Sequence, residues 1–206
     1  MEWNIAHMTQ TRVKMLLVSL HGKILDVGGS AGTLHEELVK RFPSQQLFSL
    51  DIELLHKRTN MVIGDGQQMP FRDKSFQSIL AGETIEHIPD PRKFLQECWR
   101  VLDHNGVLAL STPNVKSWFN RITHSYHMPL HVSLFSPQEL RRVLEEEGFT
   151  IQCMELFPFT PESSDGARHK WLFPIRGIAH SFMPKEMQED MVFIARKLPQ
   201  KLQSNA

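Results

Sequence analysis

The chain has 206 residues, a length that fits one domain with a sizeable core. Its hydrophobic content of 41% and its charged content of 22% are ordinary for a soluble globular protein. Lys and Arg together number 23, as do Asp and Glu, so the overall charge provides no attraction to nucleic acid or to an anionic membrane.

Cysteine content and the first residues both bear on the compartment. The chain has 2 cysteines, Cys98 and Cys153, which are too few for a disulfide framework or a zinc knuckle. Near the start, the apolar run MLLVSL is too short to cross a bilayer and lacks a cleavage site of small residues. We therefore expect a cytoplasmic protein with reduced thiols and no integral membrane segment.

The first half of the chain alternates short apolar runs with amphipathic stretches. Apolar runs predict strands over residues 23–27, 47–50, 61–64 and 76–82. Two of these runs end next to a carboxylate, Asp51 and Asp65. Between Gly32 and Pro43 the spacing predicts a helix, and its apolar face would consist of Leu34, Leu38, Val39 and Phe42.

A second helix is predicted after residue 90. Asp90 suits an N-cap and Pro91 suits the first helical position, while Asn105-Gly106 is expected to end the helix before the next strand. The apolar stripe of this helix would consist of Phe94, Leu95, Cys98, Trp99 and Leu102.

The third helix has the clearest signals. Ser136 and Glu139 form a capping box, and Gly148 ends the helix. Further strands are predicted over residues 107–111, 149–157 and 191–198. Strands that alternate with helices indicate a mostly parallel sheet with helices on both faces.

We expect a single domain over residues 1–206 with two irregular insertions. Residues 113–133 and 158–188 are rich in Pro, His and aromatic side chains and follow late elements of the sheet. Ligands of open α/β sheets bind at the carboxyl ends of strands, so we expect these insertions to form a lid over an acceptor site.

The glycine-rich stretch ILDVGGSAGTL, residues 24–34, predicts a loop that approaches a ligand closely. It lacks the Gly-Lys-Ser/Thr of a P-loop. A dinucleotide fingerprint that starts at Gly28 would need glycine at Ser30 and Thr33, and both are missing. The spacing that occurs is Asp-x-Gly-x-x-x-Gly, in Asp26, Gly28 and Gly32.

This loop and the motifs after it in the chain resemble the class I S-adenosylmethionine-dependent methyltransferases. The stretch ILDVGGSAG resembles their first motif, and GDGQQMPFRDKSFQSILAGETIEHIPDP resembles the third and fourth. VLDHNGVLALSTPN and HVSLFSPQELRRVLEEEGF resemble the fifth strand and the elements after it, so the likeness spans residues 12–157. The resemblance implies a Rossmann-like, doubly wound, mostly parallel seven-stranded sheet with an antiparallel last strand.

The resemblance also implies a binding site for S-adenosyl-L-methionine. Asp51 would accept hydrogen bonds from both ribose hydroxyls, and Asp65 would accept from the adenine amino group. Ser30 departs from the family, which often has glycine there, and is expected at worst to weaken binding. The residues implied in cofactor binding are Asp26, Gly28, Gly29, Ser30, Gly32, Asp51, Ile52, Asp65, Gly66, Gln67, Gly82 and Glu83.

A second constellation lies in GETIEHIPD. Glu83, Glu86 and His87 are spaced i, i+3 and i+4, so one short helical turn would put them on one face. Two carboxylates and an imidazole suit a divalent metal, with His131 as a fourth ligand and with His124 and His127 behind it.

This Glu-x-x-Glu-His pattern resembles two methyltransferase groups that are associated with a divalent metal at matching positions. They are the ubiquinone-pathway O-methyltransferases and the small-RNA 2′-O-methyltransferases related to plant Hen1. The alternative is that the Glu and His side chains only cap the turn and line the site. His87 or His131 would then serve as a catalytic general base without metal, since imidazole titrates near neutral pH.

Three functions are compatible with the resemblance. The first is an enzyme that methylates a small-molecule acceptor at oxygen. The second is an RNA 2′-O-methyltransferase. The chain has no basic stretch beyond RKLPQKL, so a nucleic acid partner is less expected than a small molecule and stays open as the alternative. The third is a non-catalytic scaffold subunit. We expect a monomer or a homodimer.

Overall fold

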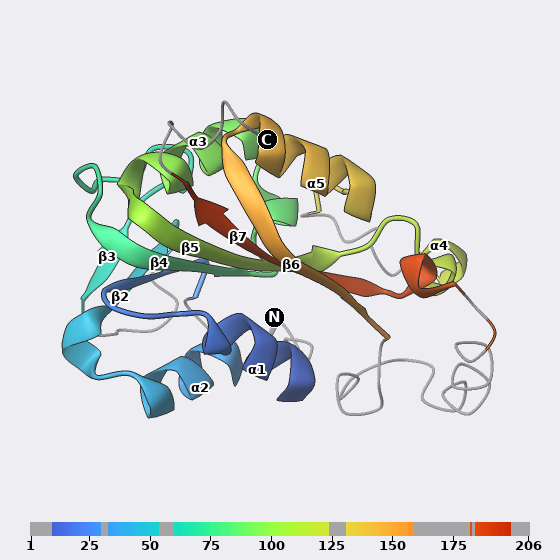
Figure 1. Cartoon of the computed structure of the whole chain (residues 1–206), viewed down its shortest axis with the longest axis horizontal. Coiled ribbons are helices and arrows are strands. Elements are labelled where there is room, and N and C mark those ends of the chain that lie inside the picture. The colour runs from blue at the N-terminus through green and yellow to red at the C-terminus, as the bar shows by residue number, and fades with distance from the viewer. Residues whose placement is uncertain are drawn as a thin grey trace.

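The computed structural model describes residues 10–29, 33–53, 60–123, 131–158, 182 and 184–198. Its centre is a seven-stranded sheet in the order β3-β2-β1-β4-β5-β7-β6 (Figure 1). The strands are β1 (Ile24–Val27), β2 (Leu47–Asp51), β3 (Met61–Ile63), β4 (Phe76–Gly82), β5 (Leu102–Pro113), β6 (Phe149–Phe157) and β7 (Asp190–Lys197).

The strand directions confirm the predicted fold class. β1 pairs in parallel with β2 and β4, and β2–β3 and β4–β5 are also parallel. The last strand, β7, lies between β5 and β6 and runs antiparallel to both. β1 is the topological switch point of the sheet. The chain adds β2 and β3 on one side of β1 and then β4 and β5 on its other side. In open α/β sheets this switch point is where ligands bind, at the carboxyl ends of the strands.

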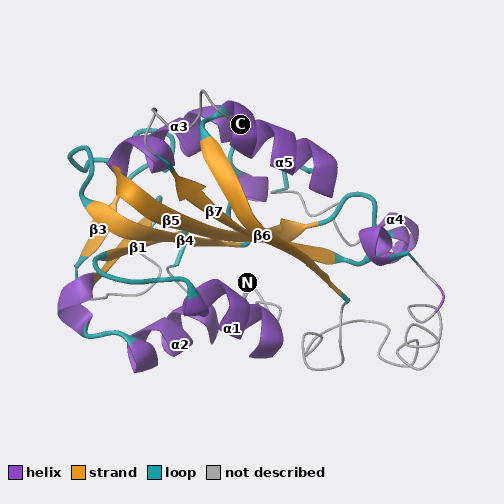
Figure 2. Cartoon of the chain, in the orientation of Figure 1, coloured by secondary structure: helices purple, strands orange, loops and turns teal. Residues whose placement is uncertain are grey.

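Helices cover both faces of the sheet (Figure 2). One face carries α1 (Gln10–Val18) and α2 (Thr33–Arg41), and the other carries α3 (Pro91–Val101) and α5 (Pro137–Glu146). A short helix, α4 (Trp118–Thr123), follows β5 within the insertion at 113–133. The rest of the two predicted lid segments falls mostly on residues 124–130, 159–181 and 183, which lie outside the described residues.

Each face of the sheet has its own apolar core. α1 was not among the elements predicted from the sequence, yet Leu16 and Leu17 are almost completely buried against β1, β5 and β7. On the other face, Phe94 and Leu95 of α3 and Leu140 of α5 are fully buried. Both faces are therefore closed to water, as a parallel sheet requires.

The caps of α3 and α5 form as predicted. Asp90 accepts a hydrogen bond from the Lys93 backbone N–H, and Ser136 and Glu139 form the full capping box. Two details differ. Val39 is 52% exposed rather than part of the buried face of α2. Asn105 does not end α3, since β5 begins at Leu102 and Asn105 lies within it with φ of 61°.

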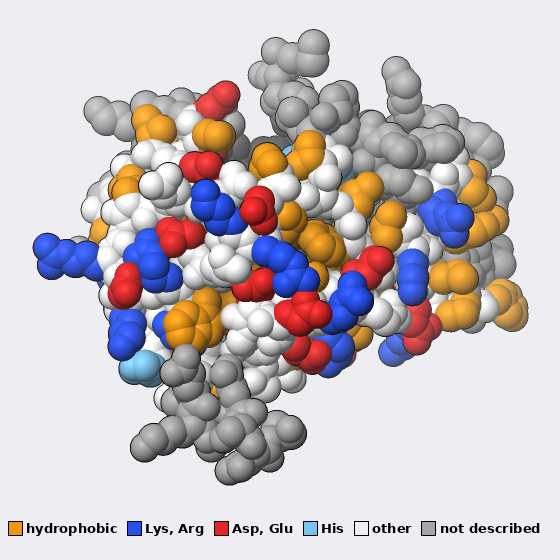
Figure 3. Space-filling view, turned by 90° about the horizontal axis from the view of Figure 1, so that it is seen from above, with side chains coloured by type: hydrophobic (Ala, Val, Ile, Leu, Met, Phe, Trp, Pro, Cys, Tyr) orange, Lys and Arg blue, Asp and Glu red, His pale blue; other side chains and the backbone are white. Residues whose placement is uncertain are grey.

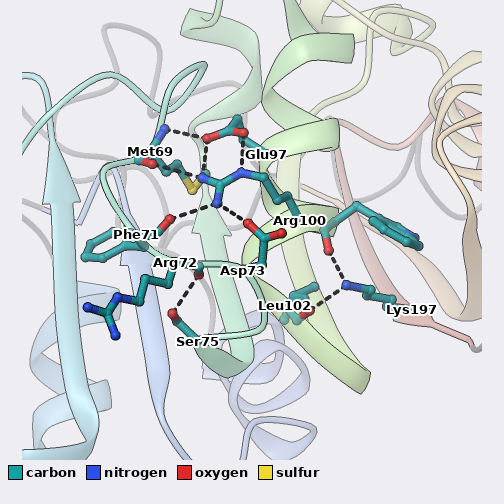
Figure 4. A network of polar contacts seen from close by, with 10 residues as sticks. Met69, Phe71, Arg72, Asp73, Ser75, Glu97, Arg100, Leu102 and Lys197 are labelled. Atoms are coloured by element: carbon teal, nitrogen blue, oxygen red, sulfur yellow. Dashed lines mark hydrogen bonds and ion pairs between the residues drawn. The ribbon is translucent and has the colours of Figure 1, made fainter.

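The loop before β4 is held by the side chain of Arg100 (Figure 4). Arg100 Nε and Nη2 donate to the two carboxylate oxygens of Glu97 at 2.7 and 2.8 Å. The same guanidinium donates to the carbonyls of Met69 and Phe71 at 3.0 and 2.8 Å, and to Asp73 at 2.7 Å. Helix α3 is therefore linked to the loop that follows Asp65.

Lys197, at the end of β7, caps the C-terminal end of α3 (Figure 4). Its ammonium group donates to the carbonyls of Trp99 and Leu102, both at 2.6 Å, and lies 3.9 Å from the centre of the Trp99 ring. A cation at a helix C-terminus interacts favourably with the helix dipole and with its last carbonyls.

The face above α3 and α5 carries charges of both signs close together (Figure 3). Ion pairs connect Arg92 with Glu146 and Glu147, and Arg141 with Glu145. This mixture agrees with the balanced composition, and the described residues of that face form no basic patch. Every helix within the described ranges is too short or too polar to cross a membrane.

Candidate functional site

The glycine loop leaves β1 at the switch point and is packed against Thr84, two residues after the end of β4. Gly28 has φ of 74°, and a Cβ built on it would lie 2.6 Å from Thr84 Oγ1. Thr84 Oγ1 donates to the carbonyl of Val27 at 2.9 Å, and the Gly28 N–H donates to the carbonyl of Leu50 at 2.9 Å. Only glycine fits this combination of backbone angle and close approach.

Asp26 lies directly beside the same loop. It is 2% exposed, and a Cβ built on Gly29 would lie 1.9 Å from its Oδ2. His35 Nδ1 in α2 is 2.7 Å from this oxygen. Of the predicted cofactor residues in this loop, Ser30 and Gly32 lie outside the described residues.

Two further predicted cofactor residues lie where neighbouring strands end. Asp51 ends β2, and its carbonyl accepts from the Gly64 N–H at 2.9 Å, just beyond β3. Ile52 follows with 71% of its surface exposed. An exposed apolar side chain beside a half-buried carboxylate fits the ring and the ribose hydroxyls of an adenosine.

Asp65 is oriented by Gln67. The Gln67 backbone N–H donates to Asp65 Oδ1 at 2.8 Å, and the Gln67 side-chain amide lies 3.1 Å from both carboxylate oxygens. The Gln67 side-chain oxygen accepts from the Asp90 N–H at 3.0 Å. Gly66 is buried against Phe94, and a Cβ there would lie 3.1 Å from its ring. This turn is therefore fixed to α3.

Glu83 does not lie on a helical turn with Glu86 and His87, so that prediction is wrong. Glu83 directly follows Gly82, the last residue of β4, and has φ of 52°, and the 3₁₀ turn η2 spans only Ile85–His87. Glu83 Oε1 accepts from Ser111 Oγ at 2.7 Å and from Arg12 Nη2 at 2.9 Å. The left-handed backbone turns Glu83 away from the helical register.

Arg12 is a site residue that sequence reasoning missed. It is 4% exposed and donates to Glu83 and to Asp190, which begins β7. Although burial opposes its charge, the two carboxylates hold the pKa of Arg12 above its usual value. The sequence does carry a signal for this buried arginine. Arg12 is next to Val13 and four positions before Leu16, so it falls on the apolar face of the helix.

Glu86 is a buried carboxylate at the centre of the second constellation. It is 1% exposed, and Thr112 Oγ1 donates to its Oε2 at 2.9 Å. Burial, and then the nearby charges of Glu83 and Asp190, raise the pKa of Glu86 well above its usual range. A cation beside Glu86 would offset the free-energy cost of burying its ionised carboxylate.

The imidazoles of His87 and His131 meet next to Glu86. Val132 and Ser133 donate from their backbone N–H groups to the carbonyl of Glu86 at 2.8 and 3.0 Å, which brings the segment after residue 130 to η2. The two imidazole rings are 4.9 Å apart in an edge-to-face arrangement.

Glu86, His87 and His131 each offer one ligand atom, and these atoms lie within 4.8 Å of one another. One carboxylate oxygen and two imidazole nitrogens fit Zn, Mn or Fe. The structure thus brings together three of the four predicted metal ligands, while Glu83 is bound by Arg12 and Ser111. His124 and His127 lie outside the described residues.

The fold, the order of the motifs and a family match agree on the class of protein. Residues 25–110 match the family described as methyltransferase domain. The family match and the curated relatives support a class I S-adenosylmethionine-dependent methyltransferase, with S-adenosylmethionine as the cofactor.

Among its curated relatives are methyltransferases of quinone biosynthesis. The chain is 27% identical over 177 residues to the demethylmenaquinone methyltransferase of Thermotoga maritima, with 70% of this chain and 77% of the relative covered. It is 29% identical to the ubiquinone biosynthesis O-methyltransferase of Histophilus somni, with 55% and 57% covered. It is 28% identical to a ubiquinone/menaquinone biosynthesis C-methyltransferase of Geotalea daltonii, with 72% of each chain covered.

Solved structures show the same fold at low identity. A methyltransferase from Archaeoglobus fulgidus, described as SAM-dependent, has a TM-score of 0.66 at 20% identity, with 91% of this chain and 92% of that chain covered. The Haloferax volcanii complex of the Trm112 methyltransferase activator with a methyltransferase contains a chain with a TM-score of 0.68 at 15% identity, with 91% of this chain and 89% of that chain covered.

Proposed function

We propose that the chain transfers a methyl group from S-adenosylmethionine to a hydroxyl oxygen of a small molecule, at a site where Glu86, His87 and His131 hold a divalent metal. The observation that carries this proposal is the convergence of these three side chains beside a buried carboxylate. Their donor set is typical of a metal site that leaves positions open for a ligand.

The cofactor would lie along the carboxyl ends of β1, β2 and β4. In this arrangement Asp51 accepts from the ribose hydroxyls, Ile52 covers one face of the adenine, and Asp65 with the Gly66-Gln67 backbone meets its edge. Gly28 and Gly29 allow close backbone approach to the methionine end, which Asp26, Gly82 and Glu83 surround. The structural support is that Asp26 and Gly28 lie at the end of β1, next to β2 and β4. Asp51 ends the adjacent strand β2, and Asp65 comes shortly after β3.

The acceptor would bind beside Glu86. A divalent cation at such a site lowers the pKa of a hydroxyl bound to it. The chain's own contribution is orientation, because a sulfonium is already a good leaving group and needs an acceptor oxygen in line with the methyl group. In the absence of metal, His87 or His131 would take the hydroxyl proton.

An aromatic, partly apolar acceptor is the class we favour. Val132, next to His131, is 59% exposed, and Trp118 and Ile122 of α4 are 47% and 57% exposed. Relatives that act in ubiquinone and menaquinone biosynthesis support this class. These relatives include both an O-methyltransferase and a C-methyltransferase, so they do not select the acceptor atom. Our proposal of an oxygen acceptor therefore depends on the proposed metal site. We place the acceptor lid in residues 113–133 and 158–188 of a single domain.

The direct test supplies labelled S-adenosylmethionine and a catechol with an apolar substituent, and locates the methyl group in the product by NMR. A methyl ether that disappears with EDTA and returns with Mn²⁺, Mg²⁺ or Zn²⁺ is the expected result. Methylation at ring carbon, or activity unchanged by EDTA, would contradict the proposal. Elemental analysis of His131→Ala, with His104→Ala as the control at an exposed position, then tests the ligand assignment.

Two measurements separate this function from its alternatives. Calorimetric titration with S-adenosylhomocysteine is expected to show binding, whereas no binding at millimolar ligand would favour the scaffold subunit. Methylation of the 3′-terminal ribose of a short RNA, with no turnover of catechols, would favour the RNA 2′-O-methyltransferase.

A further inference from the structure

His35 lies against the carboxylate at the start of the glycine loop. His35 belongs to the first turn of α2, and its Nδ1 is 2.7 Å from Asp26 Oδ2 in β1. Both side chains are largely withdrawn from water, with 11% of His35 and 3% of Asp26 exposed. Because an ionised carboxylate only accepts hydrogen bonds, Nδ1 is the protonated nitrogen and donates.

The same carboxylate oxygen supports the loop backbone. A Cβ on Gly29 would lie 1.9 Å from Asp26 Oδ2, so this oxygen is packed between the Gly29 backbone and the imidazole. The loop entrance is fixed separately, because Thr84 Oγ1 donates to the Val27 carbonyl and the Gly28 N–H donates to the Leu50 carbonyl. The contact with His35 therefore joins the far end of the loop, at α2, to β1.

We propose that His35 is a positioning residue for cofactor binding, which sets the path of the glycine loop by tying the first turn of α2 to Asp26. The inference rests on the proposed placement of the cofactor at this loop. A loop that is held in its binding conformation loses less conformational entropy when a ligand orders it. Removal of the donor should therefore lower cofactor affinity although His35 itself does not contact the cofactor.

The experiment compares His35→Leu with His35→Asn by calorimetric titration with S-adenosylhomocysteine. His35→Leu removes the donor and is expected to weaken binding about tenfold, the effect of one lost hydrogen bond to a charged group. The Nδ2 of asparagine can take the place of the imidazole Nδ1, so His35→Asn is expected to bind within about threefold of wild type. His104→Leu, at an exposed histidine, is the control and should bind as wild type.

The outcomes separate this inference from the proposed function. Wild type that fails to bind S-adenosylhomocysteine overturns the cofactor site itself. Wild type that binds, together with His35→Leu that binds equally well, overturns only the role of His35. A fall in turnover number at saturating cofactor would also overturn it, because loss of a residue that only positions the cofactor loop raises the cofactor KM and leaves the turnover number unchanged.

Thermal unfolding of each variant shows whether it is folded. If His35→Leu is unfolded, His35→Gln tests the same contact. The glutamine amide nitrogen takes the place of Nε2 rather than Nδ1, so it does not restore the hydrogen bond to Asp26. It should show the same tenfold loss, and wild-type affinity of His35→Gln would contradict the inference.

Discussion

The guanidinium of Arg12 donates to Glu83 Oε1 at 2.9 Å across 71 positions of the chain. The same guanidinium donates to Asp190, so one buried cation joins α1, the end of β4 and the start of β7. Its two partners, together with buried Glu86, place three carboxylates around one positive charge. Removal of the Arg12 guanidinium would leave its buried carboxylate partners without a compensating charge, which is strongly destabilising.

Arg12→Met is expected to lower the free energy of unfolding by about 3 kcal/mol. It should also weaken binding of S-adenosylhomocysteine, because Glu83 loses the group that orients it. Urea unfolding and calorimetric titration measure the two effects. Lys14→Met on the exposed side of the same helix is the matched control and should change neither. Equal effects of the two substitutions would contradict a special role for the buried ion pairs of Arg12.

Asp51→Asn tests the assignment of the ribose contact. The amide can accept only through one oxygen and carries no charge, so affinity for S-adenosylhomocysteine is expected to fall about 30-fold, or ~2 kcal/mol. Calorimetry is the measurement, and the stability of the free protein should be unchanged, since Asp51 is half-exposed. Glu53→Gln, two residues further on and exposed, should bind as wild type. Wild-type affinity of Asp51→Asn would remove this residue from the cofactor site.

Glu86→Gln is expected to stabilise the protein while abolishing activity. Burial raises the pKa of Glu86, so the folded protein holds a proton that the unfolded chain has released. Wild type therefore loses stability as pH rises above the usual carboxyl pKa, and the glutamine variant does not. Its advantage in urea unfolding should be larger at pH 8 than at pH 5. An equal difference at both pH values would contradict the raised pKa.

The same variant tests the metal. Mn²⁺ or Zn²⁺ that binds only the folded state should raise the Tm of wild type, and the shift should be lost in Glu86→Gln. Thr112→Val removes the hydroxyl that donates to Glu86 without removing a ligand, so it should keep most of the shift. A metal-dependent shift of the same size in Glu86→Gln would exclude Glu86 as a ligand.

Arg100→Met is expected to change the pH dependence of the free energy of unfolding. The hydrogen bond from Arg100 lowers the pKa of Glu97 below its usual value. Stability from this pair is therefore present above the usual carboxyl pKa and is lost as pH falls through the lower value of the folded state. The variant should lose about 2 kcal/mol at pH 7 and less at pH 3, measured by urea unfolding. Arg92→Met, which breaks only exposed ion pairs, should lose less than about 1 kcal/mol.

Local sequence signals were enough for most of the fold. The runs that became β1, β2 and β4 are buried apolar strands, and the capping residues Asp90 and Ser136 form the caps that their spacing predicts. Helix α1 escaped prediction because its register depends on burial against the sheet rather than on caps, and its first turn has no acidic residue. Val39 was assigned to the buried face by spacing alone, although α2 buries a narrower stripe around Leu38.

For the site, local motifs in the sequence by themselves predict the class of cofactor and propose Asp51 and Asp65 as its contacts at the strand ends. Only the tertiary structure decided how the charged groups pair. Glu83 bonds to Arg12, His35 bonds to Asp26, and His131 meets His87 through the carbonyl of Glu86. These contacts join residues that are far apart or in different elements, and they depend on strand order and on a left-handed backbone at Glu83, which no local spacing specifies.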